Sequence, residues 1–336
     1  MSGEKRFLPY SQGPKTRKSN FERMSFITVC LVVDQHTVRK KGLLRVRLMS
    51  RLPWSKRKAL VAAPLRVPGL LAGKRALVIG HRGYSAFAPE NTLPAFRLAL
   101  EAGVDLVELD FRQSADGQLV VFHDPDLDRT TDARLRWGGK HLRVESMTAA
   151  EIRTLDAGQW FDSKFAGTAV PLLSEALDVI QPSGIALLER KSGDVETTAQ
   201  LLESKRLVGR VIVQSFDWSF LKGLHERLPQ QPLGALGPLS GLPGVKKAPG
   251  VFGQLTGRWL RALRQTGASV VVWNKQVSRR AVRQAHEQGL RVWVYTINRP
   301  ELAQKLLDIG VDGLITNNPA LIWKTMASPL HRRPHV

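Results

Sequence analysis

From residue 76 to residue 316 the chain alternates short apolar runs with amphipathic stretches, and this alternation is the feature that most limits its fold. The apolar runs, rich in β-branched residues, cover residues 76–80, 104–111, 118–124, 184–190, 210–216, 269–273, 291–297 and 312–316. Stretches with a helical period lie between most of them, at residues 92–101, 173–180, 197–205, 218–228, 258–266, 278–288 and 300–309. Strands that are apolar on both faces and separated by helices predict a buried parallel sheet. About eight such strands in about 260 residues predict an α/β fold of the TIM (β/α)8 barrel type.

Two intervals break the alternation. Residues 124–170 hold charged turns, one short helical stretch and the aromatic pair Trp160 and Phe161. We interpret them as an excursion beyond the strand ends, where barrel enzymes build the walls of their pockets. Residues 229–253 are rich in Pro and Gly and predict an irregular loop. The expected organisation is a barrel over residues 76–325 followed by a C-terminal tail, residues 326–336.

Positive charge is concentrated at the N-terminal end of the chain. Residues 1–75 hold 18 Lys and Arg against 3 Asp and Glu, whereas residues 76–336 hold 32 against 26. The first 75 residues show no sustained period, which predicts a basic, poorly ordered extension. Three interpretations stay open: a solvated tail, a contact with anionic lipid headgroups or nucleic acid, and a segment that precedes a later start at Met24 or Met49. Because the body is nearly balanced, no nucleic-acid partner is expected.

The sequence also bears on the compartment. The longest apolar stretch of the extension, residues 26–33, is far shorter than the roughly 20 residues that cross a bilayer. It also lacks the position and cleavage site of a secretory signal. The single cysteine, Cys30, can form no intramolecular disulfide. We expect a cytoplasmic protein, with peripheral contact between residues 1–75 and an anionic membrane as one option.

Titratable side chains gather where the predicted strands end. His81 and Arg82 directly follow the run at 76–80, and His123 ends the run at 118–124. In a barrel, residues just past the carboxyl ends of strands face the active-site mouth. Two imidazoles from separate strands beside an arginine favour general acid–base chemistry on a phosphoryl group. Either histidine alone is equally well explained as a hydrogen-bonded structural residue.

Three carboxylates share this setting. Glu108 and Asp110 are two apart on one strand, so their side chains leave the same face. Glu189 ends a later apolar strand, and Lys191 follows two residues on. Partly desolvated carboxylates repel one another unless a cation neutralises them. A hard divalent ion, Mg²⁺ or Ca²⁺, is the natural neutraliser, and an ion pair with a nearby Arg is the alternative.

Residues 89–92, with the sequence PENT, are expected to begin a helix. Asn91 or Thr92 would cap the free backbone N–H groups, and Pro94 would lie in the first turn, where its missing donor does no harm. In this interpretation the segment fixes the approach of the loop at residues 81–83.

Taken in order, several of these motifs resemble the glycerophosphodiester phosphodiesterases. They are HRG (81–83), PENT (89–92), Glu-x-Asp (108–110), DGQLVVFHD (116–124) with RTTD (129–132), ERK (189–191), QSF (214–216) and DGLITNNP (312–319). The likeness covers residues 77–321 and leaves out the extension. It implies a TIM barrel with an insertion, about 124–170, after the second strand. The implied reaction is hydrolysis of a small-molecule glycerophosphodiester to sn-glycerol 3-phosphate and an alcohol.

The resemblance also implies roles for single residues. His81 and His123 correspond to the catalytic acid and base, Glu108, Asp110 and Glu189 to the ligands of a divalent metal ion (Mg²⁺ or Ca²⁺), and Arg82 and Lys191 to phosphate contacts. Where the family usually has Trp-Thr-Val-Asn, this chain has Tyr295, Thr296, Ile297 and Asn298, so the width of the pocket and the alcohol preference are expected to differ. Gln214 is either a neighbour of the site or a buried hydrogen-bonding residue.

Two alternatives stay open beside this function. One is a lysophospholipase D-like phosphodiesterase that acts on lipids at a membrane surface, which the basic extension would suit. The other is a barrel without catalytic activity that binds anionic surfaces through residues 1–75. The choice of metal, the alcohol headgroup, the division of roles between the histidines and the oligomeric state are left open by the sequence.

Overall fold

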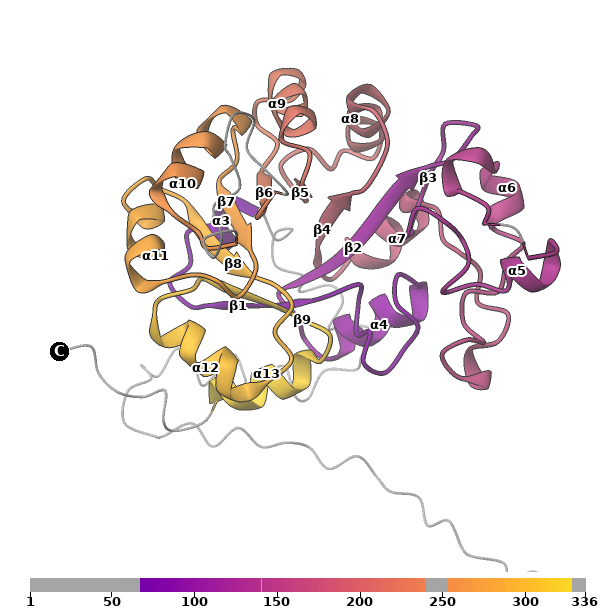
Figure 1. The fold of residues 1–336 in the computed structure, drawn as a ribbon, viewed down its shortest axis with the longest axis horizontal. Helices are drawn as coiled ribbons and strands as arrows, with labels where there is room; N and C mark the ends of the chain where they lie inside the picture. The colour runs from indigo at the N-terminus through magenta and orange to yellow at the C-terminus, as the bar shows by residue number, and fades with distance from the viewer. Residues whose placement is uncertain (1–66, 140, 240–252, 328–336) are drawn as a thin grey trace, which may run out of the picture. The chain divides into compact units, whose positions relative to one another are not determined.

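The computed structural model describes residues 67–139, 141–239 and 253–327. Its centre is a closed barrel of eight parallel strands: β1 (Leu77–Gly80), β2 (Leu106–Gln113), β4 (Ile185–Arg190), β5 (Ile212–Ser215), β6 (Leu233–Gly237), β7 (Val270–Trp273), β8 (Arg291–Val294) and β9 (Gly313–Thr316). The barrel closes because β1 pairs with β2 on one side and with β9 on the other (Figure 1). The predicted α/β fold with a TIM-type barrel is therefore confirmed.

Helices surround the barrel (Figure 1). They are α4 (Leu93–Glu101), α7 (Leu173–Ile180), α8 (Val195–Ser204), α9 (Trp218–Arg227), α10 (Gly257–Leu263) with the 3₁₀ helix η4 (Arg264–Thr266), α11 (Arg279–His286), α12 (Pro300–Asp308) and α13 (Pro319–Ala327). Their apolar side chains pack on the outward residues of the strands, as Phe96 does in one core with Val107 and Leu109. Within the described ranges, no helix has both the length and the apolar character to cross a membrane.

The inward strand positions form a second core, and a short helix covers one end of it. Leu106, Leu187 and Trp293 are among the fully buried residues of this interior layer. Helix α3 (Val67–Leu71) adds Val67, which is also fully buried, and lies near the N-terminal ends of the strands. Residues 67–71 are therefore folded against the barrel, although the sequence placed them in a poorly ordered extension. Residues 1–66, which carry most of the predicted extension, and residues 328–336 of the predicted tail lie outside the described residues.

Two strand predictions were wrong. One predicted strand does not join the barrel and one barrel strand was not predicted, so the expected total of eight strands still holds. The run at 118–124 yields only β3 (Leu119–Val120), which pairs antiparallel with β2 outside the barrel. The eighth barrel strand is instead β6, inside the stretch expected to be an irregular loop. Its glycines have a packing reason, since a Cβ at Gly237 would overlap the ring of Trp273 in the neighbouring strand. The Pro and Gly content predicted a loop, because composition alone does not show that Gly237 packs against the Trp273 ring.

The chain between β2 and α7 forms a small subdomain with its own core. Its elements are β3, α5 (Ala133–Arg136), η2 (Val144–Ser146), α6 (Ala149–Ile152) and η3 (Ser163–Phe165). Figure 1 shows β3, α5 and α6 beside the barrel, next to β2 and α4. Their apolar side chains pack on one another, with Phe122, Leu127 and Ile152 among the buried residues. The predicted bounds of the insertion, about 124–170, leave out β3 and Phe122 of this subdomain.

The fold requires glycine at position 83, and the effect of replacing it on the free energy of unfolding can be measured. Its φ of +85° disfavours L side chains, and a Cβ there would lie 2.6 Å from the backbone of Ala95 at the start of α4. Gly103 has a similar φ of +72°, but a Cβ added there would meet nothing within 4 Å. We expect Gly103→Ala to lower the free energy of unfolding by about 1–2 kcal/mol, the cost of the left-handed backbone. Gly83→Ala should cost about 1–3 kcal/mol more, because of the clash.

Urea unfolding followed by circular dichroism measures both losses. Equal losses in the two variants would show that backbone conformation alone, and not packing against α4, explains Gly83.

Candidate active site

Three buried carboxylates meet inside the barrel at the carboxyl ends of two neighbouring strands. Glu108 and Asp110 lie on β2, and Glu189 lies on β4, where the parallel register pairs it with Asp110. One oxygen of each carboxylate lies within 4.8 Å of the others, and all three residues are buried. Val107 and Leu109 face the outer core, as the two-residue period predicts. The structure therefore brings together the three acids singled out in the sequence.

The pKa values of the three carboxyl groups are shifted in different directions. Burial, followed by repulsion from Asp110 and Glu189, raises the pKa of Glu108 well above its usual value. Burial and the charge of Asp110 also raise the pKa of Glu189, to about 7. Burial acts on Asp110 in the same direction, but Lys191 and Arg82 outweigh it and lower the pKa of Asp110 to about 2. One carboxyl of the group is thus firmly ionised, and the other two hold protons readily when no further cation is present.

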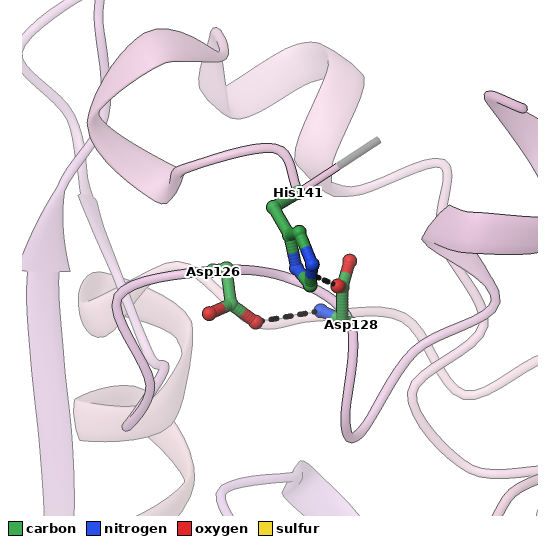
Figure 2. A group of neighbouring side chains, drawn as sticks. All are labelled: Asp126, Asp128 and His141. Atoms are coloured by element: carbon green, nitrogen blue, oxygen red, sulfur yellow. Dashed lines mark hydrogen bonds and ion pairs between the residues drawn. The ribbon is translucent and has the colours of Figure 1, made fainter. Parts of the chain in front are cut away.

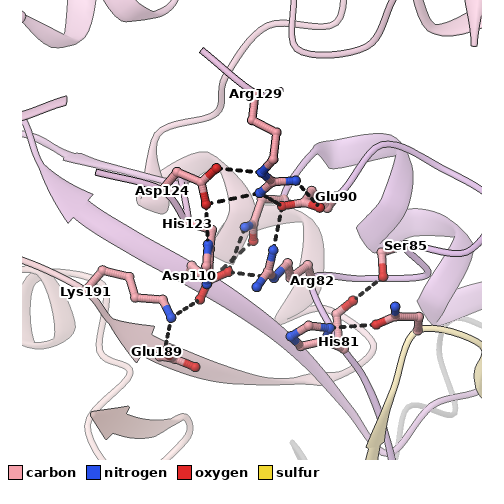
Figure 3. Close-up of polar contacts among 12 residues, drawn as sticks. His81, Arg82, Ser85, Glu90, Asp110, His123, Asp124, Arg129, Glu189 and Lys191 are labelled. Carbon is pink, nitrogen blue, oxygen red and sulfur yellow. Dashed lines mark hydrogen bonds and ion pairs between the residues drawn. The ribbon is translucent and has the colours of Figure 1, made fainter. Parts of the chain in front are cut away.

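Two cations enter the site beside the acids (Figure 3). Arg82 places Nε 3.2 Å from Asp110 Oδ2, and its backbone N–H donates to Glu108 Oε2 at 2.7 Å. Lys191 pairs with Glu189 and lies 3.3 Å from Asp110 Oδ1. The ion pair considered as the alternative to a metal is therefore present. It is incomplete, however, because two positive side chains face three carboxylates.

The remaining negative charge fits a divalent cation. Glu108 Oε1 is buried and has no hydrogen-bond partner among the described residues, and Asp110 Oδ1 has only the ion pair with Lys191. All the donor atoms are carboxylate oxygens, which hard ions such as Mg²⁺ and Ca²⁺ prefer. Glu108, Asp110 and Glu189 could hold such an ion between them.

His81 follows β1 and is held by a residue from the other end of the chain. Its Nδ1 lies 2.6 Å from Oδ1 of Asn317, which follows β9. Since an amide oxygen only accepts, Nδ1 carries the proton and Nε2 has a free lone pair. Burial and the positive charge of Arg82 lower the pKa of His81 to about 4. The imidazole is therefore neutral near pH 7, which leaves the lone pair on Nε2 available.

His123 reaches the site from the start of the insertion, not from the end of a barrel strand as predicted. The backbone N–H of Phe122 donates to the carbonyl of Asp110, and Arg112 Nε donates to the carbonyl of His123, so this segment is fixed beside β2. His123 Nδ1 lies 2.6 Å from Oδ1 of Asp124. Burial lowers the pKa of His123, while the charge of Asp110 and the bond to Asp124 oppose that shift. The charge of Asp110 acts on both histidines, and Figure 3 shows them around it.

A chain of ion pairs joins His123 to Arg82. Arg129 donates from Nε to Asp124 Oδ2 at 2.6 Å and from Nη2 to Glu90 Oε1 at 2.7 Å. Glu90 also accepts from Arg82 Nη1 at 2.6 Å. Charges alternate along this chain from imidazole to guanidinium, and Figure 3 shows it above Asp110. Glu90, Asp124 and Arg129 had no predicted role in the site, although they lie in the PENT, DGQLVVFHD and RTTD motifs.

The expectation for Asn91 was wrong. Its Nδ2 donates to Asp110 Oδ2 at 2.8 Å, and its Oδ1 accepts from the backbone N–H of Asp110 at 3.1 Å. Asn91 therefore orients a carboxylate of the site and does not cap α4. Thr92 occupies the N-cap position, as one of the two candidates, but makes no capping side-chain bond, and Pro94 lies in the first turn as predicted. A left-handed φ of 59° at Asn91, which sequence does not reveal, turns the side chain toward β2.

Two aromatic side chains, Phe216 and Tyr295, lie on the side of the site where Lys191 is. The rings of Phe216 and Tyr295 pack edge to face with centroids 6.2 Å apart, and the Lys191 ammonium lies 6.0 Å from the Phe216 centroid. The hydroxyl of Tyr295 donates to the carbonyl of Gly237 at 2.8 Å, so this ring is fixed. Gln214 is buried, with Nε2 3.5 Å from Glu189 Oε2.

Comparison with known proteins agrees with this geometry. The chain is 32% identical over 252 residues to the glycerophosphodiester phosphodiesterase of Caldanaerobacter subterraneus, covering 73% of this chain and 95% of the relative. It is 31% identical over 274 residues to that of Bacillus subtilis, covering 76% and 88%. A phosphodiesterase of Oleispira antarctica, solved with the product sn-glycerol-3-phosphate, superimposes with a TM-score of 0.65 at 27% identity and covers 76% of this chain and 98% of that one. Residues 81–321 match the model of the glycerophosphoryl diester phosphodiesterase family, from the HRG motif to the start of the last helix. The chain belongs to this family of phosphoric diester hydrolases.

Proposed function

We propose that the protein hydrolyses glycerophosphodiesters to sn-glycerol 3-phosphate and an alcohol, with His81 as general base and His123 as general acid in the first step. The observation that carries the proposal is the convergence of two differently held imidazoles on one group of three buried acids. His81 is fixed by an amide oxygen that cannot stabilise an imidazolium by charge. His123 is fixed by a carboxylate that can. This difference gives each ring one role.

Glu108, Asp110 and Glu189 are the proposed ligands of one divalent ion, Mg²⁺ or Ca²⁺. Such an ion, when bound, withdraws electron density from the phosphate and offsets its negative charge. Arg82 and Lys191 contribute to the same charge balance from either side of Asp110 and are the proposed phosphate contacts. Asn91 and Gln214 hold two of the three carboxylates in place.

In the first step Nε2 of His81 takes the proton of the substrate's glycerol 2-hydroxyl. The resulting oxygen attacks phosphorus and forms a five-membered cyclic phosphate, and the bond from phosphorus to the alcohol oxygen breaks. His123 gives its proton to that oxygen, and the alcohol leaves. In the second step His123 takes a proton from water, the hydroxide attacks phosphorus, and the ring bond to the 2-oxygen breaks. His81 returns its proton to that oxygen, which restores both imidazoles and gives sn-glycerol 3-phosphate.

The lipid-directed alternatives differ from this proposal in what residues 1–75 do. Residues 1–66 lie outside the described residues, so contact with an anionic membrane stays a prediction. A barrel that only binds surfaces would not need His81 and His123 beside a three-acid group. We therefore favour the enzyme, and turnover of glycerophosphocholine against lysophosphatidylcholine separates the two substrate classes.

Removing either imidazole should abolish most of the activity. We expect His81→Ala and His123→Ala each to lower kcat on glycerophosphocholine by at least about 10²-fold, because each removes a proton-transfer group. His286→Ala is the matched control, since His286 pairs with Asp312 at 2.7 Å, outside the site, and should retain turnover. A near wild-type kcat in either active-site variant would refute the proposed roles.

Metal removal should also abolish turnover. After dialysis against a chelator we expect loss of activity, because three carboxylates would then face only two cationic side chains. Addition of Mg²⁺ or Ca²⁺ should restore the wild type but not Glu108→Gln, which lacks one ligand. Unchanged turnover after verified metal removal would argue against the three-acid site.

The bond to Asp124 should set the alkaline limit of activity. In Asp124→Asn the carboxylate that raises the pKa of His123 is gone, so that pKa should fall. His123 must be protonated to act as the acid, and a lower pKa means that it loses its proton at lower pH. The alkaline limb of the pH profile of kcat/KM should therefore move to lower pH. Asp178→Asn, which removes a surface pair with Lys205, should leave the limb in place. The same limb in all three proteins would contradict the role of Asp124.

A further inference from the structure

A second group of metal-binding side chains lies in the insertion, formed by Asp126, Asp128 and His141 (Figure 2). The backbone explains why they meet. Asp126 forms an antiparallel bridge with Arg143, and the N–H of Leu127 donates to the carbonyl of Leu142 at 3.0 Å. This register places Asp128 opposite His141, and Asp126 on the same face as Asp128.

The Asp128 carboxylate is largely enclosed but has few partners. Its side chain is only 10% exposed, and its Oδ1 has no hydrogen-bond partner among the described residues. Among the described residues outside the group, Arg134 places Nε 3.9 Å from Asp128 Oδ2, beyond hydrogen-bond distance. Within the group, Oδ2 lies 2.5 Å from Nδ1 of His141. Buried carboxylates normally accept several hydrogen bonds or bind a cation, so this one indicates a ligand that completes its coordination.

We propose that Asp126, Asp128 and His141 bind a divalent transition-metal ion, with Zn²⁺ as the representative, at a site separate from the three-acid group. One ligand atom of each residue lies within 4.8 Å of the others. Since the His141 side chain is 74% exposed, it is free to rotate by the small amount that Zn–N and Zn–O bonds of about 2.0–2.2 Å require. A mixed set of one imidazole and two carboxylates favours Zn²⁺ over Mg²⁺ or Ca²⁺, which bind through oxygen. Three protein ligands leave a fourth position for water.

The ion would join two segments of the insertion that are also linked by the backbone bonds from Leu127 N–H to Leu142 and from Val144 N–H to Pro125. Asp126 and Asp128 precede Arg129, whose guanidinium binds both Asp124 and Glu90. Binding at this site would therefore stabilise the loop that carries Arg129. The site itself does not depend on the proposed function of the barrel.

Zn²⁺ binding to the full chain tests the proposal. Isothermal titration with ZnCl₂ should show a site that is weakened by at least about 100-fold in His141→Gln, because losing a direct ligand costs more than losing an outer contact to a ligand, which costs about 10–100-fold. Because this side chain is largely exposed, the variant should fold. Asp128→Asn, which removes the buried charge, should lose the same site.

Two further variants identify where the ion binds. His286→Gln removes an exposed His–Asp pair outside the insertion and should keep the site. Glu108→Gln alters the three-acid group and should also keep it. Addition of Zn²⁺ should raise the unfolding temperature of the wild type, His286→Gln and Glu108→Gln by more than that of His141→Gln, which keeps only the three-acid group. Unchanged Zn²⁺ affinity in His141→Gln, or loss in Glu108→Gln alone, would overturn the proposal, whether or not the barrel hydrolyses glycerophosphodiesters.

Discussion

The arrangement at the carboxyl end of the barrel depends on how three buried carboxylates are kept close together. Glu108, Asp110 and Glu189 are held by backbone register, which fixes their Cα positions whatever the charges do. Arg82 and Lys191 lower the cost of ionising Asp110, whereas at Glu108 burial and the neighbouring carboxylates outweigh the bond and the charge of Arg82. Uncompensated negative charge in a dry site has a large free-energy cost, so the pair of strands is prepared for a cation before any substrate arrives. The unusual backbone at Arg82, with φ at 54°, places its N–H against Glu108 and its side chain against Asp110.

The insertion also contributes residues to the site. His123 lies in the segment that leaves β2, and its carboxylate partner is held by Arg129 from the same excursion. The pairing of Arg129 with Glu90 then connects this segment to the loop after β1. Positive and negative groups alternate along the path, so each ion pair is flanked by favourable charges. A displacement of the insertion would therefore change the environment of both Arg82 and His123.

Sequence reasoning predicted the parts of the site that follow from strand periodicity. Glu108 and Asp110 share a face because side chains alternate along a strand, and this relation needs no tertiary information. Asn317 and Asn91 were missed as site residues because their roles depend on contacts across 236 and 19 positions of the chain. Strand β6 was missed because LGALG has the composition of a loop, and only the bulky Trp273 ring beside it explains the glycine. His123 was identified as a site residue, but from an incorrect strand prediction. Its apolar run resembles a barrel strand, although only two residues of that run pair with β2.

The pairing of β1 with β9 has a consequence for how the enzyme matures. His81 is held by Asn317, so the first and last strands of the barrel must be side by side before that imidazole has its partner. A chain emerging from the ribosome presents the acids of β2 and β4 long before residue 317 is synthesised. Any fragment that ends earlier lacks both the closing strand and the amide that fixes the tautomer of His81. Competence for hydrolysis should therefore arise only after residue 317 has been synthesised and β9 has paired with β1.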